Sequence, residues 1–216
     1  MDRSFFLPHA LEVAPRLLGA QLSLDSEQGP VTIRITEVEA YMGLGSGGRY
    51  DPGSHSKDRK TDRNASMFLG PGHAYVYFSY GMHFALNLVC SPEGIASGVL
   101  IRSGEVLDGI ELARERRLAK RSKGSDPSTL KDKDLARGPG NFAAALGITR
   151  PAHDGLDLFA RPFAIRQAED LEVKIVSGPR VGVAGIAGGP EFPWRFWIDR
   201  DRTVSAFKPG RNAPRA

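Results

Sequence analysis

The chain has a single cysteine among its 216 residues and lacks any long apolar run. Cys90 cannot form an internal disulfide, and one thiol cannot supply a cysteine-based zinc site. No segment approaches the roughly 18 apolar residues that a membrane span needs. Asp2, Pro8, His9 and Glu12 also interrupt the N-terminus where a signal peptide would be continuously apolar. We therefore expect a cytoplasmic protein without a membrane partner.

Neither sign of charge dominates, since 29 Lys and Arg face 25 Asp and Glu, for a formal net charge of +4. The chain is long enough to bury one sizeable core. It shows no internal repeat, and its 25 Gly and 15 Pro are scattered rather than gathered into a linker. We expect a single domain over residues 1–207. The basic segment 208–216 has little apolar surface to bury, so we expect it to be disordered.

Strand-like and helix-like segments alternate without a strict order. The alternating run VTIRITEVEAY predicts a strand over residues 31–41, and β-rich runs on both sides of Tyr80-Gly81 predict a protruding hairpin. Further strands are expected at 97–102, 172–176, 181–184 and 194–198, and helices at 8–18, 110–121, 128–136 and 141–146. This mixture predicts an α+β domain with a curved antiparallel sheet and flanking helices.

A glycine-rich polar stretch at residues 43–65 is too long for a plain connection, and loops of this length usually bind or cover a ligand. It carries Asp51, His55 and Asp58, residue types that can bind a metal ion. Their spacing matches no established metal-binding signature, so we expect no metal there.

Positive charge gathers in residues 111–137, where nine Lys or Arg stand against five acids. The net excess in this segment equals that of the whole chain. Two interpretations are open: the segment contacts phosphates, or it is a solvated helix face.

Glu39 is the sharpest candidate for chemistry, because period two places it and Glu37 on the face of the strand that begins with three aliphatic residues, Val31, Ile33 and Ile35. A carboxylate on an apolar face loses hydration, which suits acid or base work. The structural alternatives are an ion pair with Arg34 or Arg102, or a β-bulge that returns the carboxylate to solvent.

Aromatic residues crowd the predicted hairpin. Tyr75 and Tyr77 share one strand face, whereas Phe78 and Tyr80 share the other. Aromatic side chains in hairpins are usually core residues. Tyr80 lies at the tip beside Gly81, however, where an exposed ring could stack on bases or wedge between them.

Together these residues resemble the alkyladenine or 3-methyladenine DNA glycosylases, monofunctional enzymes of base excision repair. The YVYFSYGM and GVLIR blocks in this order are the most specific part, and the resemblance spans residues 7–207. The matching segments are EVEAY at 37–41, His-Ser at 55–56, TDRNASMF at 61–68, PGHAYVYFSYGMHFALN at 71–87, GVLIR at 98–102, LARGPG at 135–140, GPRVGV at 178–183 and PWRFW at 193–197.

This resemblance implies an enzyme that flips damaged purines out of duplex DNA and hydrolyses the N-glycosidic bond, leaving an abasic site. The implied substrates are 3-methyladenine and 7-methylguanine, with hypoxanthine and ethenoadenine as further candidates. It implies no cofactor, no lyase activity and no obligate protein partner, so we expect a monomer that meets DNA in the cytoplasm, or at the nucleoid in a bacterium.

The resemblance also assigns roles. Glu39 matches the general base that activates a water near C1′, and Arg102 matches the residue that holds this water and the carboxylate. Tyr80 matches the side chain that enters the minor groove and fills the gap left by the flipped nucleotide. Base-pocket positions are Tyr41, His55, Tyr77 and Asn87, and DNA-backbone positions are Arg63, Asn64, Met82 and Arg137.

Within the pocket, the rings of Tyr41, His55 and Tyr77 match stacking walls that favour a cationic base. Asn87 matches the position that crowds the 2-amino group of normal guanine, whereas its structural alternative is an amide bonded to the backbone. The sequence departs from the family pattern in a longer loop before His55 and in Ser-Gly-Glu-Val at 103–106, so the pocket shape could differ.

Two other functions compete with this one. A related fold could act as a non-catalytic nucleic-acid-binding domain, although a pure binder needs neither a buried carboxylate nor a wedge. A metal-dependent nuclease could instead use the Asp51, His55 and Asp58 cluster.

Overall fold

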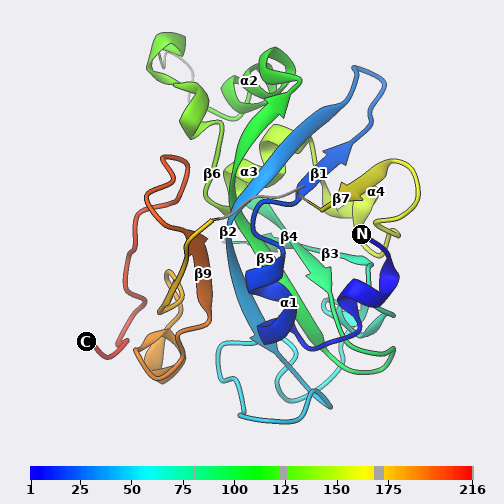
Figure 1. Cartoon of the computed structure of the whole chain (residues 1–216), viewed down its shortest axis with the longest axis vertical. Coiled ribbons are helices and arrows are strands. Elements are labelled where there is room, and N and C mark those ends of the chain that lie inside the picture. The colour runs from blue at the N-terminus through cyan, green and yellow to red at the C-terminus, as the bar shows by residue number, and fades with distance from the viewer. Residues whose placement is uncertain (80, 122–125, 168–172, 216) are drawn as a thin grey trace.

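The protein is described here by a computed structural model that covers residues 1–79, 81–121, 126–167 and 173–215. In this part of the chain, nine strands form one antiparallel sheet that branches at its long central strand, β2 (Figure 1). The main path runs β3-β4-β5-β2-β1-β7, while β6 pairs with β5, and β9 pairs with both β2 and β8. The strands are β1 (Gln21–Leu24), β2 (Val31–Met42), β3 (Ala74–Ser79), β4 (His83–Val89), β5 (Ser97–Asp108), β6 (Ala136–Arg137), β7 (Phe163–Arg166), β8 (Ile175–Gly178) and β9 (Arg195–Ile198).

The helices are short and flank this sheet. α1 packs on β2, and α3 packs on β4 and β5, so that both contribute to one apolar core. Among the described residues, no helix is both long and apolar enough to span a bilayer. The α-helices are α1 (Ala10–Arg16), α2 (Ile110–Leu118), α3 (Pro139–Leu146) and α4 (Arg150–His153), and the 3-10 helices are η1 (Arg3–Phe6), η2 (Ala65–Phe68), η3 (Pro127–Thr129), η4 (Asp132–Asp134) and η5 (Gly185–Gly188).

The α+β prediction and its antiparallel sheet are confirmed. Two local predictions are wrong. Residues 128–136 form two 3-10 turns and the start of β6 instead of a helix, and residues 181–184 are a turn instead of a strand. The strand expected at 97–102 continues to Asp108, where it pairs with the beginning of β2.

The strand β2 changes its buried face partway along. Val31, Ile33 and Ile35 belong to the main core, but further on Val38, Ala40 and Met42 do so. The change coincides with irregular pairing to β5, whose register skips Thr36 in β2 and Arg102 in β5. Such bulges shift the alternation of side chains by one residue. Glu37, Glu39 and Tyr41 therefore leave the apolar face on which period two had placed them.

The bulge does not return Glu39 to solvent, because β9 pairs along this part of β2 and residues 178–183 lie over it. Both Glu37 and Glu39 are completely buried. A second, polar layer thus covers the side of β2 that the main core does not use.

The C-terminal segment differs from the expectation of disorder. It runs beside the loop that follows β8 (Figure 1). The backbone N–H of Gly182 donates to Lys208 O at 2.8 Å, and that of Gly185 donates to Arg211 O at 2.9 Å. The prediction missed this because the contacts are made by backbone atoms and require few apolar side chains.

Candidate active site

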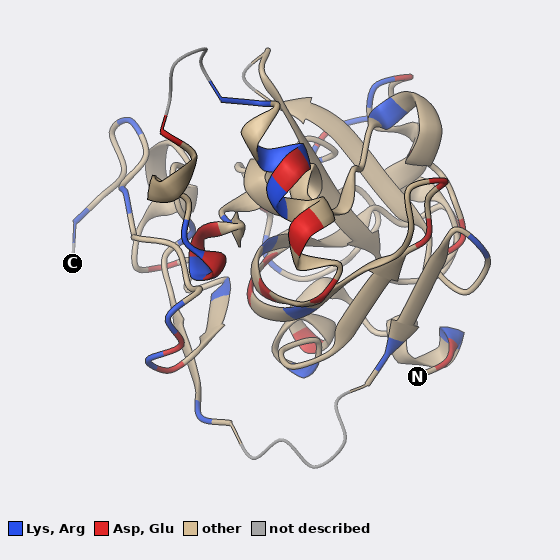
Figure 2. Cartoon of the chain, turned by 90° about the horizontal axis from the view of Figure 1, so that it is seen from above, with Lys and Arg blue, Asp and Glu red and all other residues tan. Residues whose placement is uncertain are grey.

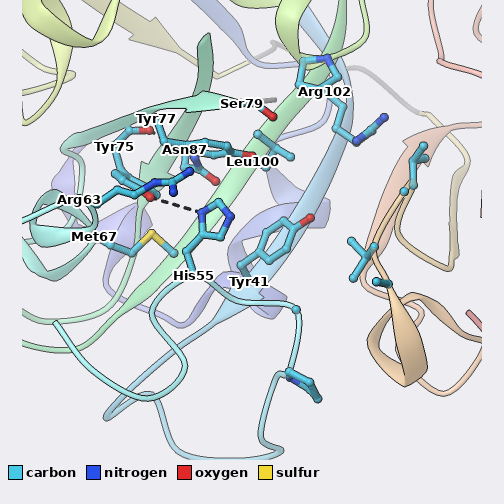
Figure 3. A pocket seen from close by; sticks show the side chains of 17 residues that line it. Tyr41, His55, Arg63, Met67, Tyr75, Tyr77, Ser79, Asn87, Leu100 and Arg102 are labelled. Carbon is cyan, nitrogen blue, oxygen red and sulfur yellow. Dashed lines mark hydrogen bonds between the residues drawn. The ribbon is translucent and has the colours of Figure 1, made fainter. Parts of the chain in front are cut away.

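A cavity of about 500 Å³ opens between β2, β3, the loop after β2 and the loop after β8 (Figure 3). This volume lies within the usual range for small-molecule sites. Aromatic and charged side chains share its lining, and Figure 3 shows Tyr41 and Arg102 on one side of the cavity with Tyr75 and Arg63 on the other. The five base-pocket and catalytic candidates that line it are Tyr41, His55, Tyr77, Asn87 and Arg102.

Glu39 lies directly behind this lining. Its Oε1 accepts a hydrogen bond from the backbone N–H of Val181 at 2.7 Å and lies 3.3 Å from Nη1 of Arg102. Its Oε2 accepts a hydrogen bond from the Tyr41 hydroxyl at 2.8 Å. All three partners line the cavity, so the carboxylate is one layer from its interior. The structure thus brings Glu39 and Arg102 together, and Arg34 is the wrong partner because it pairs with Glu105 and Asp201.

Glu37 accepts more hydrogen bonds than Glu39 does. It accepts hydrogen bonds from Nε of Arg102 at 3.1 Å, Nε of Arg195 at 2.7 Å and Oγ of Ser103 at 2.6 Å, and from both N and Oγ of Ser205. Burial alone would raise the pKa of Glu37, but the two guanidinium groups and these donors together hold it below its usual value. Arg102 therefore bridges two buried carboxylates.

Arg180 packs against the Tyr41 ring, and no pattern in the sequence pointed to this contact. Its guanidinium is fully buried and binds both oxygens of Asp51, at 2.7 and 2.6 Å, and also the carbonyl of Ala40 at 3.1 Å. It lies over the Tyr41 ring, 4.5 Å from the centroid. Burial, and then the negative charge of Glu39, raise the pKa of the Tyr41 phenol well above its usual value, so it remains a hydrogen-bond donor.

Two of the loop residues considered as metal ligands, Asp51 and Asp58, form ion pairs and hydrogen bonds within the protein. Asp51 pairs with Arg180, and Asp58 pairs with Lys57 and accepts a hydrogen bond from Tyr50. Across the described part of the chain, no cluster of His, Cys, Asp and Glu could hold a metal ion.

His55 stands at the mouth of the cavity among aromatic rings. Its Nδ1 lies 3.4 Å from the Tyr75 hydroxyl, and its ring meets that of Tyr77 edge-on at 4.7 Å (Figure 3). Burial and the nearby Arg63 lower the pKa of His55, which favours the neutral imidazole. Tyr75 lines the cavity as well. The period-two relation to Tyr77 was the signal that could have added it to the predicted site.

Asn87 is buried in β4 and lines the cavity. Its Nδ2 donates to the carbonyl of Tyr75 at 3.3 Å. The backbone-bonded amide that the sequence analysis offered as an alternative is therefore present, and the same side chain still borders the cavity.

The candidates for DNA-backbone contact lie in different surroundings. Arg63 is exposed where it lines the cavity mouth, and Met82 is 67% exposed in the turn after β3. Asn64 is buried, and its side chain binds the backbone of the loop that carries it, which differs from the expected contact with DNA. Tyr80 lies outside the described residues.

Arg137 and its basic neighbours are largely occupied within the protein. Arg137 donates from Nε to Val204 O at 2.9 Å and pairs with Asp134. Arg116 holds the end of α3 through Leu146 O at 2.8 Å, and Arg117 is buried against backbone carbonyls, where burial lowers its pKa to about 10. Figure 2 shows acidic and basic positions interspersed along this part of the molecule. These contacts favour a structural use of the arginines over phosphate binding.

Known proteins resemble this chain over nearly its whole length. A family model described as methylpurine-DNA glycosylase matches residues 4–202. Three curated proteins described as "putative 3-methyladenine DNA glycosylase" are similar to it. The one from Leifsonia xyli is 48% identical over 95% of this chain and 92% of its own length. Those from Streptomyces avermitilis and Nocardia farcinica are 46% and 45% identical, over 96% and 94% of this chain and 92% and 89% of their own lengths.

Proposed function

Because this chain belongs to the methylpurine-DNA glycosylase family, we propose that it excises 3-methyladenine and related damaged purines from duplex DNA by hydrolysis, leaving an abasic site. The observation that supports this most directly is the completely buried Glu39, fixed by Arg102, Tyr41 and Val181 immediately behind an aromatic cavity.

The cavity suits a base that has been rotated out of the helix. Unstacking a nucleotide costs a few kcal/mol, which a pocket must offset. Tyr41, His55 and Tyr77 offer ring surfaces for stacking, and a methylated cationic base gains further from them. A neutral His55 adds no positive charge of its own to this site. Asn87 borders the space in which we place the 2-amino edge of a guanine, which would exclude the normal base.

In the proposed reaction Glu39 is the general base. It takes a proton from a water molecule whose oxygen attacks C1′, while the bond from C1′ to the base nitrogen breaks and its electron pair moves to the base. A base that is already cationic leaves as a neutral molecule. Arg102 pairs with the carboxylate and orients it. This sequence of steps needs neither a covalent intermediate nor a lysine.

The finer substrate range belongs to the same proposal. We include 7-methylguanine because it is cationic, and hypoxanthine and ethenoadenine as neutral lesions that need a separate proton source. Tyr80, between the two strands of the hairpin in the sequence, would fill the gap in the duplex, with Arg63 and Met82 as the backbone contacts. The enzyme would act on duplex DNA as a monomer in the cytoplasm.

The test is base release from methylated duplex DNA and from oligonucleotide duplexes carrying hypoxanthine or ethenoadenine, with EDTA present. We expect wild type to release base and leave uncut abasic product, and Glu39→Gln to retain DNA binding but lose release by at least about 100-fold. Glu105→Gln is the matched control, since this carboxylate pairs with Arg34 and Arg202, away from the cavity.

The competing functions give different results in the same experiment. A non-catalytic nucleic-acid-binding domain would bind duplex DNA without releasing any base. A metal-dependent nuclease would cut the phosphodiester backbone and would stop in EDTA.

A further inference from the structure

We propose that the Tyr41 hydroxyl is a positioning group for Glu39, so that one side chain both stacks the flipped base and aims the carboxylate at the attacking water. This inference deepens the proposed glycosylase function and rests on it.

The two oxygens of Glu39 have unequal surroundings. Oε1 is bound by the N–H of Val181 at 2.7 Å and faces Arg102 at 3.3 Å. Oε2 accepts one hydrogen bond among the described residues, the 2.8 Å bond from Tyr41. Oε1 is thus engaged by a hydrogen bond and by the positive charge of Arg102, whereas Oε2 has the Tyr41 hydroxyl alone and keeps one of its two acceptor sites for water. The oxygen left to act as base is therefore the one that Tyr41 holds.

Tyr41 is suited to this task because its own position is fixed. Its ring is backed by the buried guanidinium of Arg180, which also binds the carbonyl of Ala40 in the preceding residue. Burial and the charge of Glu39 keep the phenol protonated, so it donates across the whole pH range in which the enzyme would work. A purine stacked on the cavity side of the ring would restrict it further. Base binding and orientation of the carboxylate are thereby joined through one side chain.

Other charged groups also face Glu39, and they must remain constant in any test. Glu37 lies two residues away in β2, Arg102 comes from β5, and Arg195 of β9 is its partner in the strand register. Arg180 approaches from the loop after β8, with its charge balanced by Asp51. Replacing the Tyr41 hydroxyl with hydrogen changes none of these groups.

Tyr41→Phe is the variant that tests the proposal, because it keeps the ring and removes the donor. We expect its affinity for an ethenoadenine duplex to stay within about twofold, since the stacking surface is retained. The single-turnover rate of base release should fall about tenfold, as expected for the loss of one hydrogen bond to a charged group. A fall in rate with retained affinity is the signature of positioning, since a general disturbance of the pocket would weaken both.

Two further variants distinguish the positioning role of the Tyr41 hydroxyl from a general disturbance of the cavity. Tyr50→Phe removes a tyrosine hydroxyl that binds Asp58 outside the cavity and should leave the rate of base release unchanged. Tyr41→Leu removes ring and hydroxyl together and should weaken both affinity and rate. Retained binding of the duplex shows that the two phenylalanine variants are folded, and circular dichroism checks the fold of Tyr41→Leu.

The outcomes distinguish the two levels of the proposal. If wild type releases base but Tyr41→Phe keeps the wild-type rate, or loses affinity alone, the positioning role is overturned and the glycosylase function stands. If wild type releases no damaged base from any duplex, both are overturned.

Discussion

Glu37 and Glu39 are two residues apart in β2 and equally buried, but only one of them has a hydrogen-bonding site to spare. Both oxygens of Glu37 are occupied, by Arg102, Arg195, Ser103 and Ser205. An anion so fully satisfied is a poor acceptor for a further proton, and its charge instead balances the two guanidinium groups. Glu37 therefore has a structural role: it joins β2, β5 and β9 to Ser205 in the segment after β9.

Glu37→Gln should lower the free energy of unfolding by about 3 kcal/mol, because it leaves two buried guanidinium groups without their shared anion. The pKa of Glu37 is lowered in the folded state, where burial opposes the shift but Arg102 and Arg195 outweigh it. Its contribution to stability is thus present above the ordinary glutamate pKa and is lost as the pH falls through the lower folded-state value.

Chemical denaturation of wild type and Glu37→Gln from pH 7 down to pH 3 checks this prediction. The gap between the two proteins should narrow as the pH drops. A gap that stays constant with pH would show that the Glu37 charge does not stabilise the fold.

For individual residues, the sequence predicted one buried ion pair, Glu39 with Arg102, and missed another, Asp51 with Arg180, and each outcome has a physical reason. Glu39 stands out because the alternation in β2 is local and sets a charged residue on the face that begins with three aliphatic residues, and Arg102 was one of two basic residues considered as its partner. Arg180 follows Gly178 and Pro179, a context typical of an exposed turn. Its partner Asp51 lies 129 residues earlier, a separation that no periodicity encodes.

At the scale of elements, the paired irregularities in β2 and β5 place the site. Skipping Thr36 and Arg102 in the register turns Glu39 and Tyr41 away from the main core and leaves Arg102 between the two glutamates. Local alternation cannot reveal such a bulge, because each half of β2 alternates normally. The short strands β1 and β7 were missed as well.

Two loops that border the cavity are tied together by the buried pair of Asp51 and Arg180. Asp51→Asn and Arg180→Met should each lower the free energy of unfolding by about 3–5 kcal/mol, because each leaves one charge buried without its partner. The double variant should cost less than the sum of the two, since it removes both charges. Denaturation of the four proteins gives the coupling energy.

A second pair joining the same two loops serves as the control. Arg49 and Glu191 are both about half exposed or more, so Glu191→Gln should change stability by less than about 1 kcal/mol. Additive costs for Asp51→Asn and Arg180→Met would contradict the proposed link.

At the scale of the whole molecule, the site depends on segments from both ends of the chain. β2 supplies Glu39 and Tyr41, whereas residues 181–184 close the opposite side of the cavity, and the segment after β9 lies against them. The pattern of strand-like and helix-like segments predicted the α+β class and the antiparallel sheet well, since these follow from many local signals. Composition was the basis of the prediction for the C-terminus. It did not predict the docked C-terminus, because a basic segment rich in Pro and Gly has the composition of a disordered tail.

Deleting residues 208–216 should therefore loosen a wall of the cavity. The backbone bonds from Gly182 to Lys208 and from Gly185 to Arg211 would be lost, which should cost about 1–3 kcal/mol in unfolding free energy. Affinity for a duplex that carries a damaged base should fall severalfold, because Val181 to Ala184 would be less well ordered before binding. Gly210→Ala should act in the same direction, since a Cβ there would overlap the carbonyl oxygen of Val183.

A control variant distinguishes the backbone hydrogen bonds of this segment from the positive charge of its side chains. Lys208 and Arg211 are exposed and use their backbone carbonyls, so Lys208→Ala with Arg211→Ala keeps both hydrogen bonds while removing two positive charges. This double variant should retain wild-type stability and should weaken DNA binding only in a manner that added salt removes. If instead it reproduces the full effect of the deletion while Gly210→Ala has none, the segment acts through its charge and not by supporting the cavity wall.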